Sequence, residues 1–338
     1  MNKDKYNVAI VGATGAVGQE MLRILEERDF PVDELRLIAS ERSAGKKYNF
    51  KGKELVVKKL DNNSFENIDI ALFSAGSSLS KEFSDSAVKS GAVVIDNSSA
   101  FRMDPQVPLV IPEINPNAAK SNNGIIANPN CTTAVTIMAL KPLHDLSKIK
   151  RVVATSFQAV SGAGAGGISE LENQTEKWPD LDNVETDTFP YQIAFNVIPH
   201  IDSFTDNDYT KEEMKLHNES RKILEDDSIN ITATTVRVPV FRAHSVSVNI
   251  ETKDKITPEQ AREAINKFPG IQVVDDPKDL KYPMPIDSSG KDDCFVGRLR
   301  EDYTIPNGLA FWVTGDQLRK GAALNAVQIA ELLIAQND

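Results

Sequence analysis

The sequence is poor in cysteine, in long apolar runs and in clustered positive charge. Its two cysteines, Cys131 and Cys294, are too few for a disulfide framework in 338 residues and suit a reducing compartment. No stretch reaches the ~20 apolar residues of a membrane-spanning helix, and no apolar signal region precedes the first strand. A net charge of −11 without a Lys/Arg run argues against nucleic acid as a partner. We therefore expect a cytoplasmic protein that binds small molecules, and neither membranes nor nucleic acid.

A metal-ligand pattern is also missing. The chain has four histidines, and none is grouped with cysteines or carboxylates at the spacing of a metal site. We therefore expect no metal. Cys294 does not precede a predicted helix, and His144, His200 and His217 have no chemical partners nearby in the sequence, so we expect structural roles for these four residues.

The N-terminus contains a strand, a glycine-rich turn and a helix in succession. The apolar run Tyr6–Val11 predicts a buried strand, and Gly12-Ala13-Thr14-Gly15-Ala16-Val17-Gly18 follows at once. Val17, Met21 and Leu25 then recur at four-residue spacing, as on one face of a helix. In this order the glycines allow a tight turn and let the backbone approach a pyrophosphate at the helix N-terminus. The pattern predicts a dinucleotide-binding unit.

Further strands and helices alternate over the first part of the chain. Apolar runs at 35–39, 70–73, 92–96 and 124–127 predict strands, with helical stretches such as 80–90 between them. This alternation is typical of an α/β fold with a doubly wound parallel sheet of the Rossmann type. Ligands of such sheets bind beyond the carboxyl ends of the strands. We therefore expect the last of these loops to bring Cys131 to the bound nucleotide.

The pattern changes near residue 150. β-Rich segments at 151–157, 231–238, 245–251 and 309–314 predict a mixed or antiparallel sheet within an α+β domain. Capping boxes at Thr210 and Thr257 predict two helices, and a last helix at 320–335 is expected to pack back on the first domain. We expect residues 1–131, completed by a C-terminal helix at 318–338, to form the nucleotide-binding domain. Residues 132–317 are then the second domain.

The loop after the second strand indicates which nicotinamide cofactor binds. An acidic residue there hydrogen-bonds the ribose 2′-hydroxyl of NAD, whereas a 2′-phosphate requires a cation. The segment reads Ala39-Ser40-Glu41-Arg42-Ser43, in which Arg42 and Ser43 can hold a phosphate. Glu41 favours NAD if it turns inward. We interpret Glu41 as facing solvent and predict NADP(H), with NAD as the alternative.

A candidate nucleophile lies in the segment Asn128-Pro129-Asn130-Cys131-Thr132-Thr133, which leads into the apolar run 134–140. The proline and the small polar residues predict a turn, and the apolar run predicts a helix. Cys131 then lies near a helix N-terminus, where the dipole favours a thiolate. A lone cysteine is more often a small buried apolar residue, but the nucleotide signature favours a nucleophile here.

Charged residues of the second domain complete the set of candidates. Arg237 ends one predicted strand and His244 starts the next, across a turn that contains Pro239. We expect both side chains at the same edge of the second sheet. Glu212 and Lys215, three residues apart, share a face of the predicted helix. Taken alone, this last pair favours a surface ion pair.

Together these residues closely resemble the aspartate-β-semialdehyde dehydrogenase family. The resemblance runs from about residue 8 to 328 and is carried by four segments in the family's order: 12–18, 128–133, Gln158 ahead of 161–164, and Arg237 with His244. It implies an enzyme, commonly a homodimer, that uses NADPH to convert 4-phospho-L-aspartate into aspartate semialdehyde and inorganic phosphate. It also implies a place in lysine, threonine and methionine biosynthesis, with 132–317 as the catalytic and dimerisation domain.

The resemblance also implies a role for each site residue. Cys131 attacks the acyl phosphate and forms a thioester, whose carbonyl can accept a hydride. The backbone N–H of Cys131 and the Asn130 amide hold the oxyanion, and His244 takes the thiol proton and later acts as the acid. Gln158 orients the acyl chain. The substrate-binding residues are Arg237 for the α-carboxylate, Glu212 for the amino group, and Lys215 and Arg102 for phosphate. The cofactor-binding residues are Gly12, Thr14, Gly15, Ala16, Val17, Arg42, Ser43, Ser161, Gly162 and Gln317.

Three alternatives stay open. N-acetyl-γ-glutamyl-phosphate reductase runs the same chemistry on a longer acylated substrate, but its cysteine usually has Gly before it and an aromatic residue after it, where this chain has Asn130 and Thr132. Glyceraldehyde-3-phosphate dehydrogenase shares a Cys-Thr-Thr run, but its cofactor strand favours an acidic residue. A catalytically silent relative that serves as an interaction protein should have lost Cys131 or its partners, and this chain retains them.

Overall fold

The computed structural model describes residues 3–181 and 184–335 and separates into two compact units. The first unit contains the chain up to Asn130 together with the residues from Ala322 onward, and the second contains Cys131–Gly321. Residues 336–338, at the end of the predicted C-terminal helix, lie outside the described residues. No helix within the described ranges is both long and apolar enough to cross a bilayer.

The first unit is built on a six-stranded sheet in the order β5-β2-β1-β6-β7-β8. Every neighbouring pair in it is parallel. The strands are β1 (Tyr6–Val11), β2 (Val32–Ala39), β5 (Lys58–Lys59), β6 (Ile70–Phe73), β7 (Val93–Asp96) and β8 (Ile125–Ala127). Strand order reverses between β1 and β6, which is where such sheets bind their ligands. The predicted doubly wound parallel sheet is confirmed.

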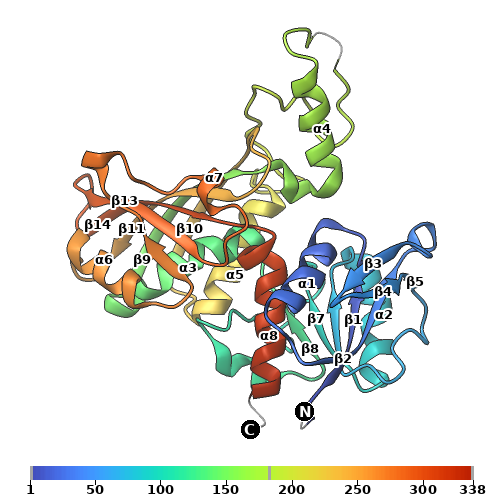
Figure 1. Ribbon diagram of the computed structural model, residues 1–338. Coiled ribbons are helices and arrows are strands. Elements are labelled where there is room, and N and C mark those ends of the chain that lie inside the picture. The colour runs from blue at the N-terminus through green and yellow to red at the C-terminus, as the bar shows by residue number, and fades with distance from the viewer. Residues whose placement is uncertain (1–2, 182–183, 336–338) are drawn as a thin grey trace. The chain divides into compact units, whose positions relative to one another are not determined.

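Helices cover both faces of this sheet. Val8 and Ile10 of β1 join the core formed by α1 and α8, whereas Ala9 and Val11 join a second core on the opposite face, which includes Ala87 of α2. This division follows the alternation of side chains along a strand. Figure 1 shows α1 and α8 side by side. The helices are α1 (Ala16–Glu27), α2 (Ser77–Lys89) and α8 (Leu324–Ala335). A hairpin of β3 (Lys47–Phe50) and β4 (Lys53–Val56) contributes Phe50 to the core of α1 and α8.

The second unit contains a six-stranded mixed sheet in the order β10-β9-β11-β14-β13-β12. The strands are β9 (Ile149–Gln158), β10 (Asn230–Arg237), β11 (His244–Thr252), β12 (Ile271–Val273), β13 (Cys294–Asp302) and β14 (Gly308–Gly315). The outer pairs β10–β9 and β12–β13 are parallel, and the three central pairs are antiparallel. The mixed sheet confirms the prediction for this part of the chain, although β12 and β13 were not predicted. A register shift between Gly297 and Arg300 breaks the two-residue period of β13.

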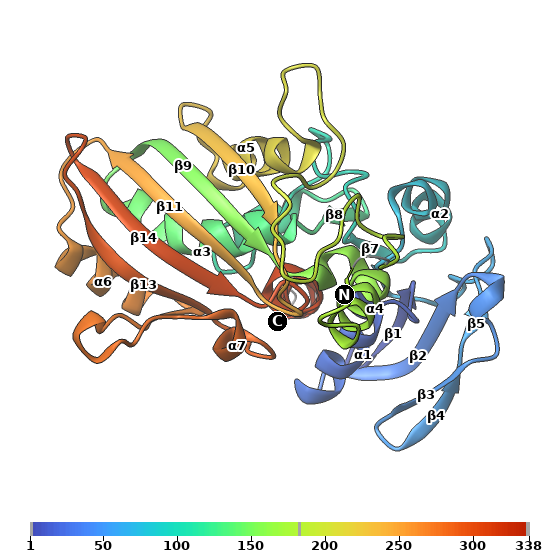
Figure 2. The same ribbon diagram turned by 90° about the horizontal axis from the view of Figure 1, so that it is seen from above.

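One face of this sheet is covered by helices. The helices of the unit are α3 (Cys131–Leu146), α4 (Gly164–Glu176), α5 (Lys211–Leu224), α6 (Pro258–Lys267) and α7 (Pro285–Ser288). Figure 2 shows the strands in front of α3 and α6, so the face toward the viewer carries neither helix. Both predicted capping boxes are present: the Thr210 hydroxyl accepts from the Glu213 N–H, and Thr257 accepts from the Gln260 N–H.

Candidate active site

The glycine turn of the first unit has the backbone geometry that a pyrophosphate needs. Gly12 has φ +84°, and a Cβ there would lie 2.8 Å from the Ser74 carbonyl oxygen. A Cβ on Gly18 would lie 2.3 Å from the Gly12 carbonyl oxygen, so α1 approaches the turn as closely as it does only because Gly18 has no side chain. Gly15 is the N-cap of α1, whose first residues are Ala16 and Val17. The predicted residues 12–17 thus place a helix N-terminus behind an open turn, which fits a dinucleotide.

The candidate adenosine end lies beside this turn. Thr14 Oγ1 donates to Ser43 Oγ at 3.3 Å, so the predicted residues of the two loops are in contact. Glu41 is 79% exposed at its side chain and pairs with Lys59 at 2.9 Å. It therefore faces solvent, as predicted. Arg42 is exposed and Ser43 is buried.

Arg102 lies in the first unit, where it holds two backbone segments. Its Nε donates to the Asn128 carbonyl and its Nη2 to the Asn97 carbonyl, each at 2.8 Å. Arg102 is 7% exposed. The two hydrogen bonds fix the loop that leads to Asn130, whose side chain is also buried, at 6% exposed. A guanidinium can also bind a phosphate.

Asn325 of α8 is a contributor to this loop that the sequence did not reveal. Its Nδ2 donates to Asn128 Oδ1 at 2.6 Å and to the Val110 carbonyl at 2.9 Å. Asn128 Nδ2 donates in turn to Asn97 Oδ1 and to the Ala322 carbonyl. Asn128 and Asn325 are both fully buried. The segment before Cys131 is therefore fixed by the C-terminal helix, and the sequence signal was an asparagine within a mostly apolar helix.

Cys131 is the first residue of α3, as the turn-then-helix pattern predicted. Its Sγ lies 3.5 Å from Nε2 of His244, the first residue of β11. The thiol is partly accessible, whereas His244 is fully buried. Gly321 lies against the cysteine, since a Cβ at that position would be 2.9 Å from Cys131 Cβ. Gly321 was also missed by the sequence analysis, although a glycine within a helical run was a signal.

The position of the proton on His244 follows from its other nitrogen. Nδ1 accepts the Ala159 N–H at 3.1 Å. Burial first, and the charge of Arg237 second, hold the pKa of His244 well below its ordinary value, so the ring is neutral. A neutral imidazole has one donor and one acceptor, so the proton is on Nε2, which faces Cys131. In this state His244 donates a hydrogen bond toward the sulfur, which stabilises a thiolate, whereas loss of this proton from the neutral ring would leave an imidazolate. Taking the thiol proton at Nε2 first requires the Ala159 hydrogen bond to break.

Arg237 is joined to His244 through the same backbone segment. Its Nη1 donates to the Ala159 carbonyl at 2.7 Å, and its guanidinium lies 5.6 Å from the centre of the Phe189 ring. Gly162 packs against both residues, since a Cβ there would lie 2.8 Å from Arg237 Nη1 and 3.4 Å from His244 Nε2. Burial lowers the pKa of Arg237, while Glu212 and Cys131 raise it, and the guanidinium keeps its charge throughout. A side chain at position 162 would therefore displace the Arg237 guanidinium.

A chain of contacts next to Arg237 joins Gln158, Glu212 and Lys215. Arg237 lies opposite Gln158 in the parallel pairing of β10 with β9. Gln158 Nε2 donates to Glu212 Oε1 at 3.2 Å, and Lys215 Nζ lies 3.1 Å from Glu212 Oε2 and 2.9 Å from Asp202 Oδ2. Burial alone would lower the pKa of Lys215, but the two carboxylates outweigh it and raise that pKa. Glu212 is 6% exposed, so the pair is not the surface ion pair that the sequence alone favoured.

The remaining predicted residues of the second unit also lie together. Gln317 Nε2 donates to Ser161 Oγ, and Gln317 Oε1 accepts the Ala243 N–H at 2.7 Å. Both side chains are buried. The structure thus brings together all nine predicted residues of this unit: Cys131, Gln158, Ser161, Gly162, Glu212, Lys215, Arg237, His244 and Gln317.

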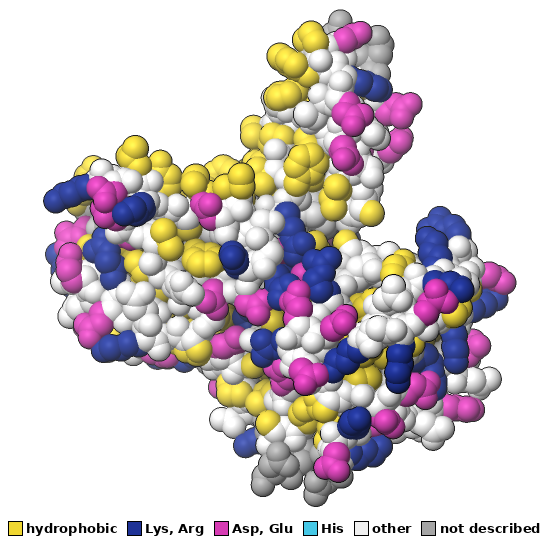
Figure 3. All heavy atoms as spheres, in the orientation of Figure 1, with side chains coloured by type: hydrophobic (Ala, Val, Ile, Leu, Met, Phe, Trp, Pro, Cys, Tyr) yellow, Lys and Arg dark blue, Asp and Glu magenta, His cyan; other side chains and the backbone are white. Residues whose placement is uncertain are grey.

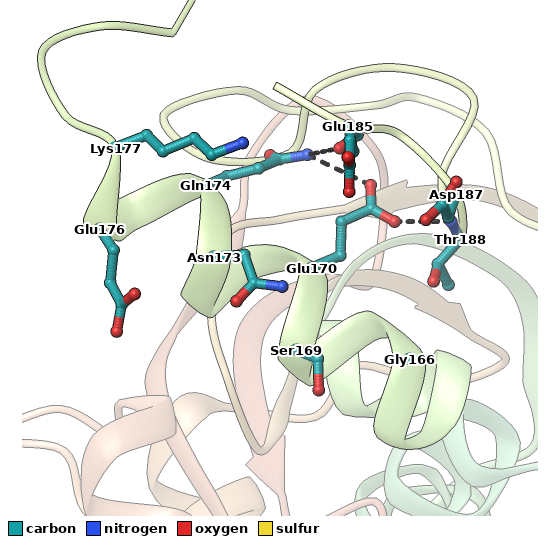
Figure 4. Close-up of a pocket in the computed structure, with 10 residues that line it drawn as sticks. All are labelled: Gly166, Ser169, Glu170, Asn173, Gln174, Glu176, Lys177, Glu185, Asp187 and Thr188. Carbon is teal, nitrogen blue, oxygen red and sulfur yellow. Dashed lines mark hydrogen bonds between the residues drawn. The ribbon is translucent and has the colours of Figure 1, made fainter. Parts of the chain in front are cut away.

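A separate cavity of about 570 Å³ lies along α4 and shares no residue with this site. Figure 4 shows its polar groups bonded to one another. Glu170 accepts the Thr188 N–H at 2.6 Å, and Gln174 donates to the Glu185 carbonyl at 2.9 Å. These bonds fasten the segment after residue 184 to α4. Across the described ranges, no group of three or more His, Cys, Asp and Glu could hold a metal ion.

The buried neutral His244 should make folding stability depend on pH. In the unfolded chain this residue takes up a proton near its ordinary pKa of 6.5, whereas in the folded protein it does not. The free energy of unfolding should therefore fall as the pH drops below about 6.5. His244→Gln removes this contribution, so its denaturation midpoint should fall less than that of wild type between pH 7.5 and 5.5. His200→Gln is the control, and equal falls in wild type and His244→Gln would contradict the expectation. His144, whose pKa burial also lowers, contributes equally to all three proteins.

The comparisons with known proteins agree with this geometry. Residues 7–122 match the family model "Semialdehyde dehydrogenase, NAD binding domain", and residues 140–320 match "Semialdehyde dehydrogenase, dimerisation domain". The chain is 56% identical over 335 residues to the aspartate-semialdehyde dehydrogenase of Aquifex aeolicus, with 98% of each chain covered. It belongs to the aspartate-semialdehyde dehydrogenase family. The Bacillus subtilis member is 49% identical, with 97% of each chain covered.

Solved structures of the aspartate-semialdehyde dehydrogenase family have the same fold. Aspartate semialdehyde dehydrogenase II of Vibrio cholerae, complexed with ASA, superimposes with a TM-score of 0.95 at 49% identity and covers 98% of this chain and 99% of its own. The Francisella tularensis enzyme gives 0.85 at 26% identity, with 97% and 99% covered. The family resemblance predicted from the sequence is confirmed, and N-acetyl-γ-glutamyl-phosphate reductase is not favoured.

Proposed function

We propose that this protein catalyses the reversible, NADPH-dependent reductive dephosphorylation of 4-phospho-L-aspartate to L-aspartate 4-semialdehyde, in amino-acid biosynthesis. The observation that carries the proposal is the Cys131–His244 pair, with a sulfur-to-Nε2 distance of 3.5 Å and Arg237 bonded to the same Ala159 segment. Family membership supports the substrate, since the relatives at about half identity are named for aspartate semialdehyde.

Cys131 carries the acyl group in this reaction. Its sulfur bonds to the acyl carbon while the carbon–oxygen bond to phosphate breaks, and inorganic phosphate leaves. The Cys131 N–H and the Asn130 amide stabilise the oxyanion that forms. The reduced nicotinamide, when bound, supplies a hydride to the thioester carbon. The carbon–sulfur bond then breaks, which releases the aldehyde and returns Cys131 as a thiolate. In the reverse direction His244 takes the proton from the thiohemiacetal hydroxyl at Nε2, after the ring proton has moved to Nδ1 and the Ala159 hydrogen bond has broken.

The polar residues around Arg237 account for the choice of substrate. The guanidinium binds the α-carboxylate in a fork beside Gly162, where a side chain would displace it. Glu212 pairs with the free ammonium group, Gln158 orients the chain, and Lys215 with Arg102 holds the phosphate. An N-acetylated substrate has no ammonium group for the buried Glu212 carboxylate, which argues against the longer acylated substrate.

The cofactor preference rests on the loop after β2. The first unit has the glycine turn of an NAD(P)-binding domain, and we propose NADP(H) because Glu41 is turned to solvent and paired with Lys59. Arg42 and Ser43 then take the 2′-phosphate. Ser161, Gly162 and Gln317 are the proposed nicotinamide-side residues.

Removal of the Arg42 guanidinium tests this preference. In Arg42→Ala, kcat/KM for NADPH should fall by about 10- to 100-fold, because a charge-assisted phosphate contact is lost. The value for NADH should stay within about twofold, since NADH has no 2′-phosphate. The exposed Lys58→Ala on β5 is the matched control for lost surface charge. An equal fall with both nucleotides would show that Arg42 does not read the 2′-phosphate.

A homodimer is the proposed assembly, formed by the second unit. The sheet face opposite α3 and α6 carries half-buried Phe157 and Trp312, whose rings lie 5.4 Å apart. Figure 3 shows hydrophobic side chains gathered on the surface of this unit. Its exposed large apolar residues include Trp178, Tyr191, Phe195, Val197 and Phe204. A surface of this kind is typical of an interface. Sedimentation equilibrium at micromolar concentration should give twice the chain mass of 37.1 kDa.

The two-cysteine composition supports a cytoplasmic enzyme.

One spectrophotometric assay tests substrate and cofactor together. Aspartate semialdehyde with inorganic phosphate should reduce NADP, and omission of phosphate should stop the reaction. N-acetylglutamate semialdehyde and NAD are run in parallel. A higher kcat/KM with the acetylated aldehyde would overturn the proposed substrate.

A further inference from the structure

We propose that Gln317 is a positioning residue that fixes the His244 ring from the loop after β14. This inference rests on the proposed function, in which His244 is the acid–base group. It gives Gln317 a role beyond a cofactor contact, because both ends of its amide already bind the two loops beside His244.

The first of these contacts is with Ala243, the residue directly before His244. Ala243 has φ +73°, a left-handed conformation that is unfavourable for a residue with a Cβ, and it is 1% exposed. Its N–H donates to Gln317 Oε1 at 2.7 Å. The β11–β14 ladder ends at the pair His244 and Gly315, so the Gln317 amide takes the place of a main-chain acceptor one residue beyond the ladder. Without that acceptor, a buried N–H would favour a different conformation at Ala243.

The second contact holds the loop on the other side of the ring. Gln317 Nε2 donates to Ser161 Oγ, and Ser161 follows the segment whose Ala159 N–H donates to His244 Nδ1. The two loops are also joined directly, since the Val160 N–H donates to the Val240 carbonyl at 2.8 Å. Gln317 thus binds the backbone before His244 with its oxygen and the loop that sets the tautomer of His244 with its nitrogen. A side chain lacking either group releases one of the two loops.

Loss of the Gln317 amide should therefore mainly change which ring nitrogen of His244 carries the proton. If Ala243 relaxes, the His244 ring rotates away from the Ala159 N–H or from Cys131, and Nε2 no longer faces the sulfur. A displacement of about 1 Å in a reacting group costs up to about 100-fold in rate. The expected signature is a changed His244 tautomer together with a lower kcat at saturating NADPH.

The test combines histidine-specific ¹⁵N NMR at pH 8 with steady-state kinetics on the full-length protein. The His244 signals are assigned by their disappearance in His244→Gln. In wild type, Nδ1 should be unprotonated and Nε2 protonated. In Gln317→Leu the two signals should move toward the average of the two tautomers, and kcat at saturating NADPH should fall about 10- to 100-fold, a larger change than any rise in the Kd for NADPH.

Two further variants serve as controls. Gln317→Glu keeps an oxygen for the Ala243 N–H and accepts from the Ser161 hydroxyl, so it should restore the wild-type tautomer and most of kcat. Gln260→Leu removes a glutamine that accepts a backbone N–H at the exposed start of α6, and it should change neither measurement. Wild-type His244 signals in Gln317→Leu, or a tenfold weaker NADPH affinity with normal kcat, would overturn the inference. The NMR result needs no substrate, so it stands even if the proposed reaction is not observed.

Discussion

Replacement of Cys131 by alanine is expected to abolish phosphate-dependent reduction of NADP by aspartate semialdehyde, with kcat lowered by about 10⁵-fold or more. Without the sulfur no thioester forms, and a carboxylate or acyl phosphate offers no comparable path for hydride transfer. Cys131 opens α3 and lies 3.5 Å from His244 Nε2, where the helix dipole and a neutral donor favour the thiolate. The Kd for NADPH should be unchanged.

Two further cysteine variants sharpen this test. Cys131→Ser keeps the shape but replaces the thiol by a hydroxyl that ionises far less readily, so it should be almost as inactive as Cys131→Ala. Cys294→Ala removes the other cysteine, which is fully buried at the start of β13 and outside the site, and should retain the activity. Mass spectrometry of enzyme trapped with substrate should locate the acyl group on Cys131. A label on any other side chain, or an active Cys131→Ala variant, would contradict the proposed reaction.

Most of the fold could be predicted from the sequence where local patterns were regular. The run Tyr6–Val11 is a strand with the predicted bounds, and the two capping boxes start α5 and α6 where the threonines indicated. β13 was missed because a register shift and a left-handed Arg298 interrupt its alternation. The short edge strands β5 and β12 have too few residues to show any period.

The candidate site could be predicted only as side chains, because its backbone contributions have no sequence signature. The Ala159 peptide segment binds both His244 and Arg237, yet any residue type supplies the same N–H and C=O. Asn325 acts through contacts almost two hundred residues distant in the sequence, which no local pattern encodes. Gly321 could have been predicted, since a glycine within a helical run indicates that another segment, here Cys131, packs closely against the backbone. The tautomer of His244 depends on this backbone and on burial, and both require the folded structure.

Replacement of His244 by glutamine should produce the second-largest loss, a fall in kcat of about 10²- to 10⁴-fold. Glutamine keeps a polar side chain at the start of β11 but cannot exchange a proton near neutral pH. Because His244 binds no part of the substrate in the proposed scheme, KM should change by less than about threefold, which separates this variant from losses in substrate binding. The neutral state of wild-type His244 should also leave kcat free of any titration of this ring between pH 6.5 and 8.

His144 provides a matched control, since it is also a buried histidine whose Nδ1 accepts a backbone N–H, from Ile149 at 3.2 Å. His144→Gln should lower stability without lowering kcat at saturating substrate, because His144 lies in the last turn of α3 while Cys131 begins the helix. Stopped-flow measurement with aspartate semialdehyde, NADP and phosphate should show the slowed step in His244→Gln before NADPH is released. Equal losses in the two variants would indicate a general effect of a buried histidine on folding. A change confined to KM in His244→Gln would place this residue among the substrate-binding groups, and the proton would then have to move through another side chain or through water.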